Sequence, residues 1–443
     1  MPEVPIILKP VLETGDLVAN LVPDRRLRYE ESRELDQTVR EIIDQVAQGG
    51  DRACQELTQR YDQVTVREFR VAPAEIDRAR SAVPEKVLLT LNTAIDQIRD
   101  FHSRQSEQSW WYERSGTQMG EIRRAVASVA AYVPGGRYPY PSSVLMTVIP
   151  AQLAGVPRIA LFTPPGRLGN IAPEILAAAS LLGIEEIYRL GGAQAVAAAC
   201  FGTETIPAVD LIVGPGNRYV TVAKKLLQGI VGIDSLAGPS EVVILAEPPA
   251  PPTWVALDLL AQAEHDPLAR AILFSPNEGF LLSVKTALER ELANQPLPFV
   301  REVPIYLLQT ESRDQAIFLA EVLAPEHLEV MLSETPGLPS RLIRAGAWFI
   351  GAGSCVAAGD YGLGPNHVIP TSGGSRFSSP LSVRHFVTTS SFVSQPDESP
   401  PEGYEELAHL ARLEGLIYHE KSLLARLGKS RLPEWVRERS GQS

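Results

Sequence analysis

The sequence of 443 residues contains few cysteines. Its three cysteines, Cys54, Cys200 and Cys355, lie far apart, and no two form a Cys-x-x-Cys pair. The pattern therefore does not support a zinc finger, a thioredoxin-type redox motif or a disulfide framework. Because such sparse cysteine usage is typical of a reducing compartment, we expect a cytoplasmic protein.

Long hydrophobic runs and an excess of positive charge are also absent. No stretch of about 20 apolar residues occurs, so we expect no membrane span. No basic segment precedes an apolar one at the start, so we expect no signal peptide. The formal net charge of −12, from 41 basic and 53 acidic side chains, argues against a protein built mainly to bind nucleic acid or anionic lipid.

The length indicates roughly two to three domains. Helical periodicity predicts helices over 31–61, with a break at Gly49-Gly50, and over 84–103. Short apolar strands then alternate with helices through Gly- and Pro-containing loops over 128–229 and again over 241–351. This alternation is typical of α/β folds with a mostly parallel sheet, and it predicts two Rossmann-like, incomplete doubly wound domains.

The two ends of the sequence lack this alternation of strands and helices. Residues 1–30 are expected to form an irregular N-terminal arm. Residues 385–443 are polar and Pro-rich at first, then form one amphipathic helix and a charged tail. Since this tail is too small to bury its own core, it must pack on another domain or on another subunit.

Glycine-rich loops follow three of the predicted strands, at 133–136, 190–192 and 213–217. Glycine at a strand-to-helix turn lets backbone N–H groups approach a phosphate at the helix N-terminus. None of the three has the G-x-G-x-x-G spacing, and the nearest match, residues 351–356, lacks the third glycine. Because such turns are also common for structural reasons alone, the spacing leaves nucleotide binding open.

Polar side chains with catalytic or ligating chemistry occur in four places. Gln262 and His265 are three residues apart on a predicted helix and could face one cation, although a capping or core histidine is equally compatible. The adjacent pair Glu326-His327, at the end of a predicted helix, suits general acid–base chemistry or a solvated loop. Residues 351–382 form a long Gly-rich segment that we expect to be an active-site loop. Glu414 and His419 are five apart and share no tight helical face.

Eight motifs occur in an order that resembles the L-histidinol dehydrogenase family over roughly residues 30–425. They are VAAYVPGGRYPYPSSVLM, RLGGAQAVAA, VGPGNRYV, DSLAGPSEVVILAE, AQAEHD, APEHLE, GDYGLGPNHVIPTSGGSRFSSPLS and EGLIYH. The resemblance implies oxidation of L-histidinol to L-histidine through the aldehyde, with two NAD⁺ consumed, in the final steps of histidine biosynthesis. It also implies one zinc ion per site and an intertwined homodimer whose C-terminal segment reaches the partner's active site.

The resemblance further implies a division of the chain. A zinc- and substrate-binding α/β domain would comprise residues 31–131 and 239–384, and an NAD-binding α/β domain residues 132–238. Residues 385–443 would be the tail that is swapped between the subunits. The zinc ligands implied by the matching motif positions are Gln262, His265, Asp360 and His419.

The remaining implied site residues fall into three groups. The family's acid–base pair matches Glu326 and His327, and its NAD contacts match Tyr132, Gln194 and Asn217. The substrate-binding positions are Ser240, Gln262, His265, His327, Asp360, His367, Glu414 and His419. We expect His327 to accept the proton of the alcohol and Glu326 to activate the water that hydrates the aldehyde.

Three other functions remain open at this stage. A relative in the same superfamily could oxidise another alcohol, such as a sulfonated diol. A zinc hydrolase could use Glu326 as its base, although no H-E-x-x-H helix is present. A non-catalytic scaffold would leave Glu326, His327 and the zinc set without a role.

Overall fold

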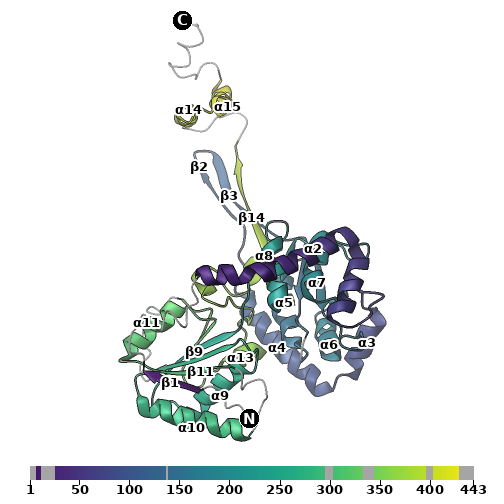
Figure 1. The fold of residues 1–443 in the computed structure, drawn as a ribbon. Helices are drawn as coiled ribbons and strands as arrows, with labels where there is room; N and C mark the ends of the chain where they lie inside the picture. Colours follow the sequence, from purple (N-terminus) through teal and green to yellow (C-terminus); the bar gives the residue numbers. More distant parts are fainter. Residues whose placement is uncertain are drawn as a thin grey trace. The chain divides into compact units, whose positions relative to one another are not determined.

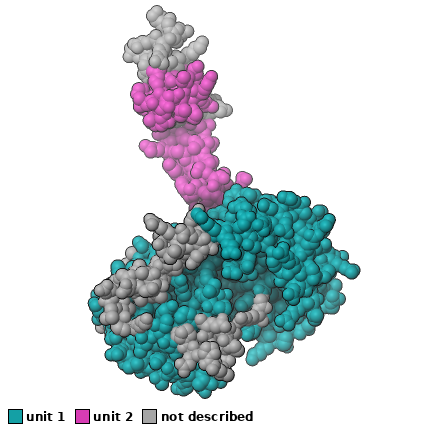
Figure 2. All heavy atoms as spheres, viewed as in Figure 1, with its two compact units in different colours: residues 1–106, 126–386 teal, residues 107–125, 387–443 magenta. Residues whose placement is uncertain are grey.

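The computed structural model describes residues 6–10, 25–135, 138–294, 303–332, 344–395 and 403–428. The chain forms two compact units, which Figure 2 distinguishes by colour: unit 1 is made of residues 1–106 and 126–386, and unit 2 of residues 107–125 and 387–443. Unit 1 contains two parallel sheets covered by helices (Figure 1), which confirms the predicted α/β class. No helix in the described ranges is both long and apolar enough to cross a bilayer.

The first sheet of unit 1 has five parallel strands in the order β6-β5-β4-β7-β8. The two strands that follow β4 in the sequence lie on one side of it in the sheet, and the next two lie on its other side. This is the arrangement of a Rossmann half. Both faces are covered, so the central strand is apolar and buried along its whole length. The strands are β4 (Ser128–Tyr132), β5 (Arg158–Thr163), β6 (Ile187–Arg189), β7 (Leu211–Val213) and β8 (Gly232–Ile233). The connecting helices are α5 (Pro141–Ala154), α6 (Pro173–Leu181), α7 (Gly192–Phe201) and α8 (Arg218–Leu227).

Three N-terminal helices pack on the helices of this sheet: α2 (Arg25–Tyr61), α3 (Pro73–Ala82) and α4 (Glu85–Ser103). Helix α2 lies against α7 and α8, while α3 lies against α6 and α4 against α5 (Figure 1). The predicted break in α2 is confirmed, since Gly50 has a non-helical φ of 52°. The predicted division of the chain groups residues 31–131 with residues 239–384. In the structure the Ala-rich surface of α7 accepts the apolar face of α2 in one shared core.

The second sheet has six parallel strands in the order β1-β11-β10-β9-β12-β13. It repeats the order of the first sheet around β9, with β1 added at one edge. Alternate side chains of β9 contribute to different cores, with Val242 and Ile244 on one face and Val243 and Leu245 on the other. The strands are β1 (Ile6–Pro10), β9 (Glu241–Ala246), β10 (Arg270–Ser275), β11 (Ile305–Gln309), β12 (His327–Met331) and β13 (Ala347–Ile350). Its helices are α9 (Pro252–Ala263), α10 (Glu278–Asn294), α11 (Arg313–Leu323) and α13 (Val356–Tyr361).

Two expectations about this sheet were wrong. Residues 6–10 of the expected irregular arm form the edge strand β1, because an apolar segment there pairs in parallel with β11. His327 does not end a helix but begins strand β12. Helix α11 stops at Leu323 because Ala324 adopts a left-handed φ of 48° and Pro325 follows it.

Unit 2 consists of a three-stranded antiparallel sheet and a pair of helices. The strands β2 (Trp110–Arg114), β3 (Thr117–Ala125) and β14 (Val387–Ser394) occur in the order β14-β3-β2. The single helix predicted after residue 406 is instead two helices, α14 (Tyr404–Leu413) and α15 (Ile417–Leu427), because Gly415 takes a positive φ of 77° between them. The core of the helix pair is small, and the large apolar side chains Trp111, Leu413 and Tyr418 are exposed.

A buried ion pair stabilises the loop that follows β7. Lys224 of α8 and Asp234 form this pair, and their side chains are only 3% and 1% exposed. Asp234 Oδ2 accepts a hydrogen bond of 2.7 Å from the Gly214 N–H, and Lys224 Nζ donates one of 3.1 Å to the Gly214 carbonyl. Gly214 is the first residue of the loop 214–217. Its N–H and its carbonyl group are therefore both hydrogen-bonded to the ion pair.

We predict that Lys224→Met lowers the free energy of unfolding by about 3–5 kcal/mol, because it leaves the Asp234 carboxylate buried without a cation. The neighbouring variant Lys225→Met is the matched control, since the Lys225–Asp36 pair is 40% and 25% exposed. It should cost less than about 1 kcal/mol. Urea unfolding followed by circular dichroism measures both. Equal losses in the two variants would contradict the prediction.

Candidate active site

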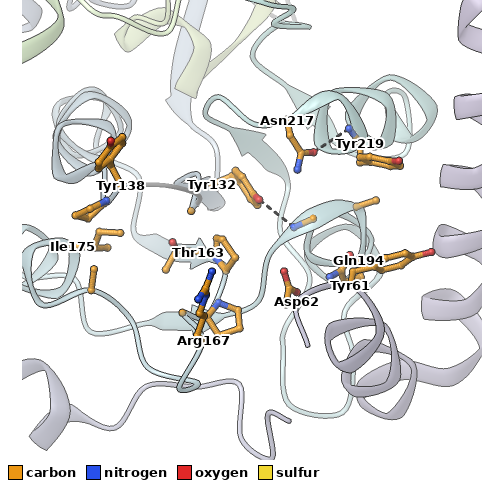
Figure 3. Close-up of a pocket in the computed structure, with 18 of the residues that line it drawn as sticks. Tyr61, Asp62, Tyr132, Tyr138, Thr163, Arg167, Ile175, Gln194, Asn217 and Tyr219 are labelled. Carbon is orange, nitrogen blue, oxygen red and sulfur yellow. Dashed lines mark hydrogen bonds between the residues drawn. The ribbon is translucent and has the colours of Figure 1, made fainter. Parts of the chain in front are cut away.

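A pocket of about 610 Å³ lies at the carboxyl ends of strands of the five-stranded sheet. Tyr132 ends β4, Gln194 lies in the first turn of α7, and Asn217 precedes α8. The structure brings these three predicted dinucleotide contacts together around one cavity (Figure 3). The carboxyl edge, where the strand order changes direction between β4 and β7, is the usual ligand position of an open parallel sheet.

Hydrogen bonds order the polar rim of this pocket. The Gly192 N–H donates to the Tyr132 hydroxyl over 3.1 Å (Figure 3). Gly192 has a φ of 70°, and a Cβ there would lie 2.5 Å from the Gln194 side-chain oxygen, so this turn requires glycine. The Asn217 side-chain oxygen caps α8 by accepting from the N–H groups of Tyr219 and Val220 at 3.0 and 3.2 Å. Hydrogen bonds from nearby main-chain N–H groups therefore fix the positions of the Tyr132 and Asn217 side chains.

Two acceptor groups in the pocket have no protein partner among the described residues. They are Asp62 Oδ2 and Thr163 Oγ1, and both atoms are buried. Burial raises the pKa of the Asp62 carboxyl above its usual value. Our sequence interpretation missed both residues, because Asp62 follows a helix of a different layer and Thr163 ends an apolar strand. Buried acceptors of this kind suit a ligand that carries hydroxyl groups.

A second cluster of polar side chains lies at the amino edge of the six-stranded sheet. Ser240 directly precedes β9, Glu326 directly precedes β12, and His327 is the first residue of β12. Gln262 lies in the last turn of α9, and Asp360 lies in α13, the short helix within the predicted active-site segment. The cluster therefore collects residues that are as far apart as 120 positions in the sequence.

Glu326 and His327 are both bound to the main chain of Glu241. The Glu241 N–H donates to Glu326 Oε2 over 2.9 Å, and His327 Nδ1 lies 3.3 Å from the Glu241 carbonyl oxygen. The two side chains also contact one another, with His327 Nδ1 at 3.6 Å from Glu326 Oε2. The parallel pairing of β9 with β12 thus positions the acid and the base together.

Burial sets the protonation of this pair. It raises the pKa of Glu326 well above its usual range, and the charges of Glu241 and Asp360 add to the effect. It lowers the pKa of His327 to about 3, so the imidazole is neutral at physiological pH. Because Nδ1 donates to a carbonyl oxygen, Nε2 carries the lone pair. His327 Nε2 is buried and has no partner among the described residues, so it is poised to accept a proton.

The predicted metal ligands of unit 1 lie in the same cluster. His265, two residues beyond the end of α9, places Nε2 at 4.0 Å from Asp360 Oδ2. The Gln262 side-chain nitrogen is buried without a partner, and burial raises the pKa of Asp360 to about 7. No group of three or more His, Cys, Asp or Glu side chains is gathered into a cation site in the described ranges. An imidazole, a carboxylate that lacks a cation and the side-chain oxygen of a glutamine nevertheless fit a divalent ion such as Zn²⁺.

His367 connects this cluster to α13 and α5. Its Nδ1 lies 3.0 Å from the Asp360 carbonyl oxygen and its Nε2 lies 3.3 Å from Ser143 Oγ. Burial lowers the pKa of His367 to about 4, so this ring is also neutral. Glu414 and His419 belong to unit 2, where both are exposed, and their predicted roles remain predictions.

Sequence reasoning missed Glu241, whose side chain supports the loop after His367. Its Oε1 accepts a hydrogen bond of 2.8 Å from the Ser372 N–H. The residue is buried, and burial raises the pKa of its carboxyl. A charged residue at the first position of an otherwise apolar strand is the signal in the sequence that marks it.

Comparisons with known proteins identify the family. The family model described as histidinol dehydrogenase matches residues 25–427. The chain is 44% identical over 410 residues to a histidinol dehydrogenase of Geobacillus kaustophilus (strain HTA426), covering 91% of this chain and 97% of that protein. It is 43% identical over 394 residues to the histidinol dehydrogenase of Bacillus subtilis (strain 168), covering 88% and 92% of the two chains.

A solved structure has the same fold. The crystal structure of histidinol dehydrogenase from Elizabethkingia anophelis superposes with a TM-score of 0.87 and 34% sequence identity, covering 96% of this chain and 98% of the other. Family model, sequence relatives and structure agree over nearly the whole length. The chain therefore belongs to the histidinol dehydrogenase family of oxidoreductases.

Proposed function

We propose that this protein catalyses the NAD-dependent, zinc-containing four-electron oxidation of L-histidinol to L-histidine through L-histidinal, consuming two NAD⁺ in the final steps of histidine biosynthesis. The neutral, buried His327 with its unpartnered Nε2 carries the proposal. This imidazole lies beside Glu326, in the same unit as a pocket lined by the three expected NAD contacts.

In the first oxidation, His327 Nε2 accepts the proton of the alcohol. NAD⁺ would supply the acceptor for the hydride of the carbon that carries this hydroxyl. An imidazole is an efficient base only while it is neutral, and the burial of His327 keeps it so. The Glu241 carbonyl, as the acceptor for Nδ1–H, fixes the tautomer and favours the protonated ring once it forms.

In the second oxidation, the aldehyde must first become a hydrate, because only then does its carbon carry a hydride to transfer. Glu326 would take the proton of the attacking water, and its position beside His327, with Oε2 at 3.6 Å from Nδ1, supports this role. Its raised pKa makes the ionised carboxylate a stronger base than an ordinary glutamate. His327 thus acts as the base of the first oxidation, and Glu326 as the base of the second.

Gln262, His265, Asp360 and His419 would hold the zinc ion. The ion, when bound, supplies a fixed point for the amine and imidazole of the substrate and keeps the aldehyde from leaving. Ser240, His367 and Glu414 would complete the substrate pocket. The buried Asp360 carboxyl, which lies 4.0 Å from His265 Nε2, supports this assignment.

Tyr132, Gln194 and Asn217 would contact NAD, and Asp62 and Thr163 would accept hydrogen bonds from its ribose hydroxyls. This assigns residues 132–238 to NAD binding and the six-stranded sheet to zinc and substrate. The protein would be a cytoplasmic homodimer. The exposed apolar side chains of unit 2 support the packing of residues 385–443 on the partner subunit.

Incubation of the purified protein with L-histidinol and NAD⁺ should yield two NADH per histidinol, and prior chelation of zinc should abolish this yield. NADH absorbance with limiting histidinol measures the ratio. Failure to oxidise histidinol, combined with turnover of another alcohol such as a sulfonated diol, would overturn the proposal in favour of a different substrate within the superfamily.

His327→Asn should lower kcat for alcohol oxidation by about 10²- to 10⁴-fold, because no base remains at Nε2. Glu326→Gln should slow aldehyde oxidation more than alcohol oxidation, and separate assays with histidinol and histidinal distinguish the two. Glu185→Gln, at an exposed glutamate distant in sequence from the site, is the control and should match the wild type. Equal losses of alcohol and aldehyde oxidation in Glu326→Gln would contradict the assignment of Glu326 to the activation of water.

The neutral state of His327 makes a separate prediction for the metal-free protein. Its folded pKa of about 3 lies below the unfolded value of 6.5, so its contribution to stability is complete above pH 6.5 and is lost as the pH falls toward 3. Below pH 6.5 the wild type should lose about 1.4 kcal/mol more per pH unit than His327→Asn. Urea unfolding at pH 7, 6 and 5 provides the measurement. Parallel stability curves would show that the ring is already charged in the folded state.

A further inference from the structure

A pair of carboxyl groups lies behind the active-site residues. Glu329 follows His327 by two positions on β12, so both side chains point to the same face of the sheet. Asp258 lies four positions before Gln262 on α9, so these two share one face of the helix. The Glu329 side chain is completely buried and Asp258 is half-buried, and their carboxyl groups lie within hydrogen-bonding reach of each other.

The hydrogen bonds of Glu329 show what this contact requires. Its Oε1 accepts a hydrogen bond of 2.8 Å from the N–H of Val356, the first residue of α13. Its Oε2 is buried and finds no donor in the described part of the chain when both carboxyls are ionised. Ionised carboxylates only accept hydrogen bonds, so a bond between two carboxyl groups needs a proton on one of them.

Electrostatics favour that proton. Burial raises the pKa of both carboxyls, and the charge of Asp258 raises the pKa of Glu329 further. Two like charges this close in a desolvated interior cannot both persist, so the pair retains one proton at neutral pH. No cation is needed to hold the two side chains together.

We propose that Asp258 and Glu329 are positioning residues, which use one shared proton to join the three elements that carry Gln262, His327 and Asp360. The carboxyl pair connects α9 to β12, and the Val356 N–H bond connects β12 to the start of α13. The inference rests on the proposed function, because it concerns the geometry of the proposed zinc ligands and base. Neither residue contacts the substrate in this scheme.

Substitution of either carboxyl group by the amide of the same shape distinguishes a role in hydrogen bonding from a role in filling space. In Asp258→Asn the amide nitrogen donates to the Glu329 carboxylate without any shared proton, so the bridge is kept. In Glu329→Gln the amide donates to Asp258, while its oxygen still accepts from Val356 N–H. In Asp258→Ala the buried Glu329 loses its partner altogether. Leu257→Ala, at a neighbouring side chain that is 47% exposed, controls for truncation of α9.

We expect Asp258→Ala to bind zinc about 10- to 100-fold more weakly than wild type and to lose kcat to a similar extent. The KM for NAD⁺ should stay unchanged, because the dinucleotide pocket lies on the other sheet. Asp258→Asn, Glu329→Gln and Leu257→Ala should remain within about threefold of wild type. Zinc affinity is measured by competition with a chromophoric chelator, without substrate or NAD⁺. Wild-type zinc affinity in Asp258→Ala, or an Asp258→Asn variant as impaired as Asp258→Ala, would overturn the proposal.

Infrared difference spectroscopy supplies a second readout that does not need zinc or turnover. The wild type minus Asp258→Asn spectrum should contain the carbonyl band of one protonated carboxyl group, because the Asn–carboxylate pair holds no such proton. Absence of this band would refute the shared proton even if Asp258→Ala fails to fold. A wild type that neither binds zinc nor reduces NAD⁺ would refute the proposed function, and the infrared result would still decide the bridge.

Discussion

The main chain of Glu241 is the point on which the active-site geometry depends. Its N–H binds the Glu326 carboxyl and its carbonyl oxygen lies within hydrogen-bonding distance of His327 Nδ1. These contacts exist only because β9 and β12 pair in parallel with Val242 opposite His327. A backbone hydrogen-bonding register thereby sets the tautomer of one side chain and the orientation of the other.

The two parallel sheets have the same strand order, yet they use opposite edges. The five-stranded sheet opens its pocket at the carboxyl ends of its strands, as open α/β sheets usually do. The six-stranded sheet places Ser240, Glu326 and His327 at its amino edge. Helix α13 follows β13 and returns Asp360 toward that edge. Two sheets of similar topology therefore carry different features, a pocket at the carboxyl edge of one and a polar cluster at the amino edge of the other.

Burial is the second constraint on the chemistry. It keeps His327 and His367 neutral, and it raises the pKa of Glu326 and Asp360, so the cluster combines neutral imidazoles with carboxyl groups of raised basicity. Desolvated groups of this kind cost stability unless they are hydrogen-bonded or meet a ligand. Unit 2, by contrast, exposes the large apolar side chains Trp111, Leu413 and Tyr418.

The amino-acid sequence by itself determined the α/β class, the break of α2 at Gly50 and the motifs of the histidinol dehydrogenase family, because local periodicity, glycine conformation and ordered motifs are all properties of short segments. The resemblance carried by those motifs also implied Tyr132, Gln194 and Asn217. The edge strand β1, the start of β12 at His327 and the supporting role of Glu241 were decided only by tertiary structure. The same holds for the Asp258–Glu329 contact, which joins residues 71 positions apart in the sequence. Strand partners and burial depend on which distant segments meet, and no pattern within one segment encodes that.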